Sequence, residues 1–227
     1  MKKKVMLGVI AAMVVSMSAT VFAAPSIGQI IPEEPQIVST ENVPEGAKIV
    51  VSTIDVTDEK VLDNYTSNEP VKTLLKTVND ENTKPTIEAV KEVLKEMNVE
   101  DVTNVETKSG EKVDLTEYKF TTPFIDIAEQ IGDEITYKTN GDLEVKVKID
   151  AAKEKKAEDL LLMLVDPETG KVVFITIDEI DPVTGELKVT FTFLGAIALL
   201  DKSAVDENEI ETQTTDAGVA DTETAAE

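Results

Sequence analysis

Apolar and polar residues alternate with the period of a β-strand along much of the C-terminal half of the chain. In residues 143–149, Leu, Val, Val and Ile alternate with Glu, Lys and Lys, and residues 187–193 alternate Leu, Val, Phe and Phe with Lys, Thr and Thr. Residues 160–165 form a continuous apolar run, which is typical of a strand buried on both faces. The pattern predicts antiparallel strands with one wet and one buried face, and a central strand at 160–165.

Turn residues stand between these strands. Ser109–Gly110 and Asn140–Gly141 each separate two short strand-like segments, and Asn-Gly is a strong two-residue hairpin signal because both turn positions need positive φ. The sequence Asp-Pro-x-Thr-Gly occurs twice, at 166–170 and 181–185. Asp accepts backbone hydrogen bonds, Pro presets φ and Gly takes the left-handed conformation that closes a hairpin. We expect the three strands around these turns to form a meander.

The first half of the chain changes from a strand pattern to a helical one. Residues 48–56 predict a strand, and a polar stretch follows it as far as Pro70. Two segments then place apolar residues on one face at helical spacing. These residues are Val71, Leu74, Leu75 and Val78 in the first segment and Ile87, Val90, Leu94 and Met97 in the second. We expect two short helices that pack on each other or on a sheet, in preference to forming a partner-binding stripe.

The two ends of the chain differ from the part between them. Residues 1–23 combine three lysines, an apolar run and small residues up to Ala23, as in a secretory signal peptide cut before Ala24. The alternative is an uncleaved membrane anchor, although the apolar run is shorter than the ~20 residues of a spanning helix. Residues 24–46 predict an extended linker, in which Ile30, Ile31, Ile37 and Val38 could form an edge strand, and residues 203–227 predict a disordered acidic tail.

Composition narrows the chemistry that the chain can perform. The 227 residues include no His, Cys, Trp or Arg, so the usual proton shuttle, thiol nucleophile and commonest transition-metal ligands are missing. With 45 acidic and 22 basic residues, the net charge is -23, which disfavours nucleic acid and anionic lipid surfaces as partners. Without disulfides, the fold of an exported protein depends on burial and backbone hydrogen bonds alone.

Acidic residues in predicted loops make calcium a candidate metal. Asp166, Glu168, Asp178 and Asp181, with neighbouring Glu179, are hard oxygen donors in predicted loops. Turn formation explains the aspartates without a metal, and no D-x-D-x-D spacing occurs there. We therefore expect no cofactor, with a calcium site as the alternative.

The sequence assigns no catalytic residue. The plausible route to an enzyme without His or Cys is a pair of carboxylates, as in glycosidases, and acidic residues are too numerous for one pair to stand out. Serine-lysine catalysis stays open as a route, since Ser and Lys residues are scattered along the chain. Aromatic residues make up only 4% of the chain. The phenylalanines at 120, 124, 174, 191 and 193 fall in apolar patterns that predict core positions, whereas Tyr65, in a polar stretch, is the better candidate for an exposed contact. We expect a protein that is not an enzyme.

The segment from Leu160 to Leu200 resembles the closing strands of immunoglobulin-like modules in secreted Gram-positive surface proteins. The resemblance lies in LLLMLV, TGKVVFITI and LKVTFTFLGAIALL, which together cover less than a quarter of the chain. It implies a noncatalytic spacer or adhesion unit and carries over no active-site residue. It also raises the hypothesis of a self-formed isopeptide bond from Lys146 or Lys148, beside Glu144, which an intact mass would test.

These observations predict an α+β protein. Residues 47–118 would form a mixed region, in which a strand and two short amphipathic helices precede an immunoglobulin-like antiparallel β-sandwich at 119–202. We expect an exported, noncatalytic interaction or structural module, secreted or held noncovalently at the cell wall, without a membrane span after signal cleavage. Its expected partner is an extracellular protein or glycan. A secreted carboxylate-dependent hydrolase and a calcium-responsive structural protein are the alternatives.

Overall fold

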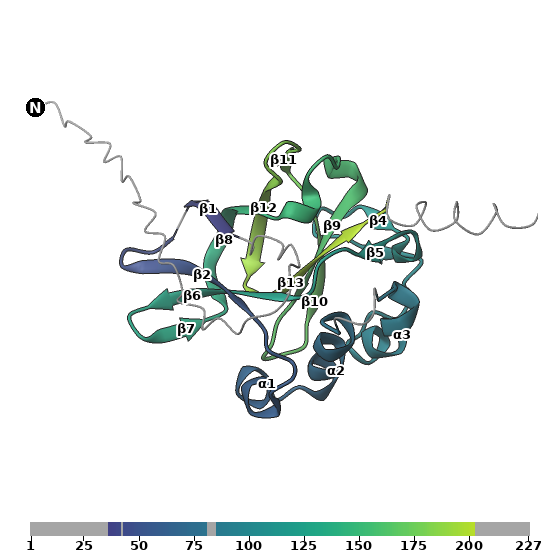
Figure 1. Cartoon of the computed structure of the whole chain (residues 1–227), viewed down its shortest axis with the longest axis horizontal. Helices are drawn as coiled ribbons and strands as arrows, with labels where there is room; N and C mark the ends of the chain where they lie inside the picture. Colours follow the sequence, from purple (N-terminus) through teal and green to yellow (C-terminus); the bar gives the residue numbers. More distant parts are fainter. Residues whose placement is uncertain (1–35, 42, 81–84, 203–227) are drawn as a thin grey trace, which may run out of the picture. The chain divides into compact units, whose positions relative to one another are not determined.

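The structure, a computed structural model, describes residues 36–41, 43–80 and 85–202, and within them it contains three α-helices and thirteen strands (Figure 1). The helices are α1 (Glu59–Tyr65), α2 (Glu69–Val78) and α3 (Ile87–Glu96). The strands are β1 (Gln36–Glu41), β2 (Ala47–Thr53), β3 (Val105–Glu106), β4 (Lys112–Val113), β5 (Lys119–Phe120), β6 (Ile125–Ile131), β7 (Glu134–Thr136), β8 (Lys138–Lys148), β9 (Leu160–Val165), β10 (Val172–Thr176), β11 (Glu179–Asp181), β12 (Glu186–Phe193) and β13 (Gly195–Asp201).

The longer strands form two antiparallel sheets. Sheet A has four strands in the order β1-β8-β12-β11. Sheet B has seven strands, with the order β10-β9-β13-β6-β2, β5 beside β13 and β7 beside β6. A separate hairpin pairs β3 with β4 across Ser109–Gly110, as the sequence predicts. The α+β class with antiparallel sheets is thus confirmed.

An apolar core fills the space between sheets A and B. Strand β8 contributes its alternate apolar residues from Leu143 onward, and β12 contributes Leu187, Val189 and Phe191, all buried, while the polar residues between them face outward. From sheet B, the even-numbered leucines of β9 reach into the same core. Period-two alternation therefore produced the expected wet and buried faces.

A second apolar core lies on the opposite face of sheet B, under the helices. The odd-numbered residues of β9 (Leu161, Met163 and Val165) pack there with the buried faces of α2 and α3 and with Ala196, Ala198 and Leu200 of β13. Strand β9 is therefore buried on both faces, as its unbroken apolar run predicts. Because β2 pairs with β6 and this core joins the helices to β9 and β13, position 118/119 does not separate two cores.

Each helix begins at a side-chain cap. The side chains of Asp58, Asn68 and Thr86 accept hydrogen bonds from backbone N–H groups in the first turns of α1, α2 and α3. Helices α2 and α3 occupy the two segments with predicted helical stripes. Helix α1 lies in a polar stretch in which the sequence predicts no helix, because its only fully buried residue is Leu62 and a seven-residue helix shows little periodicity.

The predicted hairpin at Asn140–Gly141 is wrong. Strand β8 runs through this pair, and the interval from Lys138 to Leu143 faces the shorter interval from Phe191 to Phe193, so the pair sits in an irregularity of the β8–β12 ladder. The turn lies earlier, between β6 and β7, where Gly132 has φ +62°. A glycine with positive φ serves equally well in a bulge or a turn, so local signals alone do not choose.

The predicted three-strand meander is also wrong. Strands β9 and β10 do form a hairpin, but the chain then leaves sheet B and enters sheet A, where β11 pairs with β12. Ile177, at the crossing, is buried in the core between the sheets. Crossing there lets each hairpin contribute its apolar face to the same core.

Part of the expected linker is a strand. Residues 36–41 form β1, which pairs with β8 at the edge of sheet A, in line with the edge-strand option for Ile37 and Val38. The expected signal peptide at 1–23, the first part of the linker and the acidic tail at 203–227 lie outside the described residues. Within the described residues, no helix has the length and apolar character to cross a membrane.

Candidate functional site

The first Asp-Pro-x-Thr-Gly turn connects β9 to β10 through hydrogen bonds to its own aspartate. Asp166 Oδ1 accepts from the backbone N–H groups of Glu168 and Thr169 at 2.8 and 3.4 Å, and Thr169 Oγ1 donates to Asp166 Oδ2 at 2.7 Å. Gly170 closes the turn with φ +72° and donates its N–H to the Asp166 carbonyl at 2.9 Å. The predicted turn chemistry is confirmed here.

The second copy, between β11 and β12, repeats this arrangement. Asp181 Oδ1 accepts from the N–H groups of Val183 and Thr184 at 2.9 and 3.4 Å, and Gly185, with φ +76°, donates to the Asp181 carbonyl at 2.8 Å. Hydrogen bonds lower the pKa of Asp181, and the bond from the Val183 N–H has the largest effect. Both aspartates thus use their carboxylates to hold the turns.

The four calcium candidates are not gathered into one metal site. Asp166 and Asp181 serve separate turns, Glu168 is exposed, and Asp178 Oδ2 accepts a hydrogen bond from Thr190 Oγ1 at 3.0 Å. Within residues 36–41, 43–80 and 85–202, no three Asp or Glu side chains converge in a way that could hold a metal ion. The turn function accounts for the aspartates in this part of the chain.

A buried aspartate joined to two tyrosines is the most chemically distinctive cluster in the described structure. Asp126 lies on β6, between Ser52 of β2 and Ala196 of β13, and its residue is only 8% exposed. Its neighbours Ile125 and Ile127 face the core between the sheets, so Asp126 projects from the opposite face, toward the helices. A lone carboxylate is thereby placed in an apolar layer.

Both oxygens of this carboxylate accept hydrogen bonds from tyrosine hydroxyls. Tyr65, the last residue of α1, donates to Asp126 Oδ1 at 3.0 Å, and Tyr137, in the link between β7 and β8, donates to Oδ2 at 3.3 Å. The two rings meet edge to face, with centroids 6.1 Å apart and planes at 79°. The cluster therefore ties three segments that are distant in the sequence.

Burial sets the proton affinity of this cluster. Burial raises the pKa of Asp126 to about 6, against the lowering effect of the two hydroxyl bonds. Burial and the nearby Asp126 charge raise the pKa of both tyrosines above the ordinary value, so their hydroxyls remain protonated donors. Asp126 is thus the group that exchanges a proton near neutral pH, while the tyrosines hold it.

Next to Tyr65, a second polar contact holds the end of α1 to the Asp-Pro-x-Thr-Gly turn at 166–170. Thr66 is 3% exposed, and its hydroxyl donates to the Pro167 carbonyl at 2.5 Å and accepts from the Asn68 N–H at 3.0 Å. The fit is close, because a Cβ on Gly170 would lie 2.5 Å from the Asn68 side-chain nitrogen. We call the set of Tyr65, Thr66, Asp126, Tyr137 and the turn 166–170 the α1 junction.

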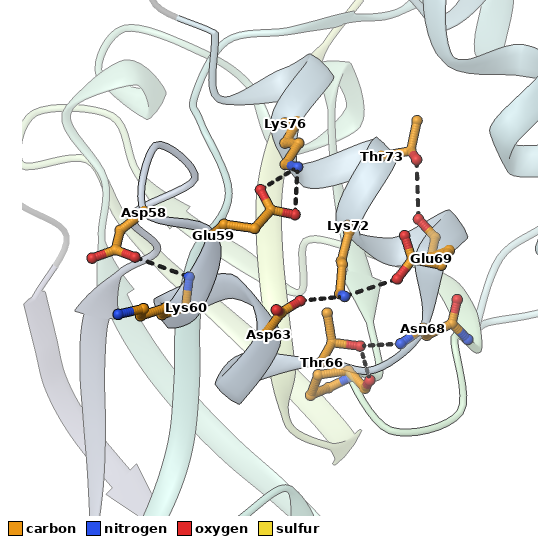
Figure 2. A network of polar contacts seen from close by, with 11 residues as sticks. Asp58, Glu59, Lys60, Asp63, Thr66, Asn68, Glu69, Lys72, Thr73 and Lys76 are labelled. Carbon is orange, nitrogen blue, oxygen red and sulfur yellow. Dashed lines mark hydrogen bonds and ion pairs between the residues drawn. The ribbon is translucent and has the colours of Figure 1, made fainter.

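Ion pairs join α1 to α2 beside this junction (Figure 2). Lys72 is 8% exposed and places its Nζ 2.5 Å from Asp63 Oδ1 and 2.8 Å from Glu69 Oε1. The bond to Asp63, which has the larger effect, and the bond to Glu69 raise the pKa of Lys72. A further pair joins Lys76 to Glu59 at 2.8 Å. The apolar faces and the ion pairs together fix α1 to α2 as one helical layer.

Sequence reasoning missed most of the α1 junction. Tyr65 was expected in an exposed polar loop, but it ends a helix, is half-buried and is bonded to Asp126. Tyr137 carried no signal of its own. Asp126 did carry one, since it is the only charged residue in the apolar strand segment Phe124–Ala128. For the isopeptide hypothesis, the carboxylate of Glu144 is in contact with Lys188, at 3.1 Å.

The comparisons add no relative to this picture. No family model, no curated protein and no solved structure matches the chain.

Proposed function

We propose that this protein is an exported, noncatalytic interaction or structural module that acts outside the cell, secreted or held noncovalently at the cell wall. The N-terminal leader pattern and the strongly acidic composition support the location. The observation that carries the noncatalytic assignment is the closure of Asp126 by two tyrosine hydroxyls.

A catalytic carboxylate needs access to a reacting group on the substrate. Burial raises the pKa of Asp126, and each of its oxygens already accepts a hydroxyl bond from a tyrosine. The pKa of each tyrosine is itself raised, so neither is suited to act as a base near neutral pH. The cluster resembles a structural tie between segments more than an acid–base site.

The finer fold proposal is an immunoglobulin-like sandwich carrying a helical layer. Its support is the resemblance of residues 160–200, together with two antiparallel sheets that face each other across one apolar core. Modules of this class act as spacers or adhesion units, and the expected partner is an extracellular protein or glycan. The net charge of -23 favours a partner surface with positive charge.

Binding and turnover can be tested on the same preparation. Chain beginning at Ala24 would be labelled and mixed with washed cells and isolated walls of the producing organism at low and moderate salt, and separately with chromogenic glycosides and peptide substrates. We expect saturable retention and no product. Product formation that disappears in Asp126→Asn would replace this proposal with the carboxylate hydrolase, and absence of retention at both salt levels would remove the binding function.

A further inference from the structure

We propose that the α1 junction is a proton-sensitive contact, in which the protonation state of Asp126 controls how firmly helix α1 is held against sheet B. The inference concerns the chain alone and is independent of the partner or the export of the protein. It stands on the geometry of a buried carboxylate that bridges hydroxyls from two other segments.

The contact of α1 with the rest of the fold is concentrated at its C-terminal end. Leu62 is the only fully buried residue of this helix, and the two ion pairs of α1 lead to α2, not to the sheet. Tyr65 and Thr66 provide the polar contacts to the sandwich, to Asp126 and to the Pro167 carbonyl. A change at Asp126 therefore acts on one of the few bonds that fix this helix to sheet B.

Burial favours the neutral form of Asp126, and the described groups that face it include no cation. The groups that face it are Tyr65 from α1 and Tyr137 from the β7–β8 link, while β2 and β13 place uncharged Ser52 and Ala196 beside it. The turn 166–170 adds negative charge, since Asp166 acts on Tyr65 and Glu168 acts on Tyr137, and each raises the tyrosine's pKa. None of these groups is a cation that could compensate a carboxylate.

The pKa of Asp126 differs between the closed and the opened junction, and this difference sets the direction of the pH effect. In the closed junction the pKa of Asp126 is about 6, and in an opened, solvated junction it returns toward 3.8. The closed form thus binds the proton more tightly, so acid favours closure, and closure weakens as pH rises through about 6. These two pKa values predict that the opening equilibrium increases about tenfold between pH 5.0 and pH 7.5.

Amide hydrogen exchange measures this opening directly. The Leu62 and Thr66 amides, hydrogen-bonded to Asp58 and Leu62, report on α1, and the β9 amides report on global unfolding. After correction for intrinsic exchange rates, we expect protection of the α1 amides to fall about tenfold from pH 5.0 to pH 7.5 in wild type, and less than twofold in Asp126→Asn. Asp133→Asn, which removes an exposed charge from the neighbouring turn, should behave as wild type.

A side-chain carboxyl ¹³C titration of the wild-type protein provides the second measurement. We expect a midpoint near 6 for Asp126, and Tyr137→Phe, which removes one hydroxyl bond to the carboxylate, should move this midpoint and the exchange transition to higher pH together. A midpoint near 4, a pH effect that persists in Asp126→Asn, or protection of the α1 amides equal to that of the β9 amides at both pH values, which would mean that α1 opens only with global unfolding, would each overturn the proposal. Because the titration uses wild type, the test holds even if a variant fails to fold.

Discussion

The two faces of sheet B are packed in different ways. On the face toward sheet A, strands β6, β9 and β13 meet β8 and β12 through apolar side chains, and the buried Glu129 and Asp201 follow the alternation of the β6 and β13 residues on this face. On the face toward the helices, the apolar core also holds Asp126, and Thr66 and Lys72 are buried in the helical layer. The same strands therefore pack against a second hydrogen-bonded sheet on one side and against short helices on the other.

Sheet A and the helices are held against sheet B by different kinds of contact. Two hydrogen-bonded sheets are rigid partners that need only interdigitating side chains between them. Short helices have no backbone hydrogen bonds to the sheet beneath them, so their position depends on a few specific contacts. The Tyr65–Asp126 and Thr66–Pro167 bonds provide such contacts here. A change in the protonation of Asp126 is consequently expected to act on the position of a helix.

Truncation of adjacent β9 residues compares the two faces directly. Leu162 faces sheet A and Met163 faces the helices, and both are fully buried. We expect Leu162→Ala to lower the free energy of unfolding by about 3–5 kcal/mol, and Met163→Ala by about 2–3 kcal/mol, because the helical layer can relax into the cavity more readily. Urea unfolding measures both. Equal losses would contradict the difference in rigidity.

A methyl group at Gly195 tests the close approach between β13 and the end of β9. Gly195 has φ +154°, and a Cβ there would lie 2.2 Å from the Val165 carbonyl oxygen. Since backbone has to move, we expect Gly195→Ala to cost about 3 kcal/mol or more in thermal or urea unfolding. Gly110→Ala is the matched control, because Gly110 has φ +85° but open space around it. Its expected cost is only the left-handed penalty of about 1–2 kcal/mol.

Neutralising Asp126 tests the packing on the helix face through the pH dependence of stability. Its folded pKa, about 6, lies above the ordinary value of 3.8, so the stability linked to its protonated form is complete below pH 4 and is lost as pH rises through 6. We expect Asp126→Asn to be about 2 kcal/mol more stable than wild type at pH 7.5 and nearly equal at pH 4. Thermal unfolding across this pH range measures the difference. If Asp133→Asn gains the same stability at pH 7.5, the gain comes from the change in net charge and not from the surroundings of Asp126.

Removal of the Thr66 hydroxyl should have the smallest of these effects. Thr66→Val keeps the shape but leaves the buried Pro167 carbonyl without this donor, which we expect to cost about 1–2 kcal/mol. Thr73→Val is the control, since the Thr73 hydroxyl bonds an exposed helix carbonyl, and its expected change lies within about 0.5 kcal/mol. If both variants lose the same stability in urea unfolding, the Thr66 contact is not a specific tie.

The elements that could be predicted from the sequence are those whose pattern repeats over several residues. Alternation in β8 and β12 and the apolar run of β9 gave their burial correctly, and the helical stripes located α2 and α3. Signals that extend over only a few residues predicted the structure less reliably. The Asn140–Gly141 pair lies inside β8, and helix α1 escaped notice because a single buried residue shows no period.

From the sequence alone one could infer which residues β8, β9, β12, α2 and α3 bury and how the two Asp-Pro-x-Thr-Gly turns close, because these depend on side-chain alternation and local hydrogen bonds. Only the tertiary structure decided that the chain changes sheets after β10, and that Asp126 meets Tyr65 and Tyr137. The physical reason is distance along the chain: residues 61 positions apart, such as Tyr65 and Asp126, come together only when the helices pack on the sheet.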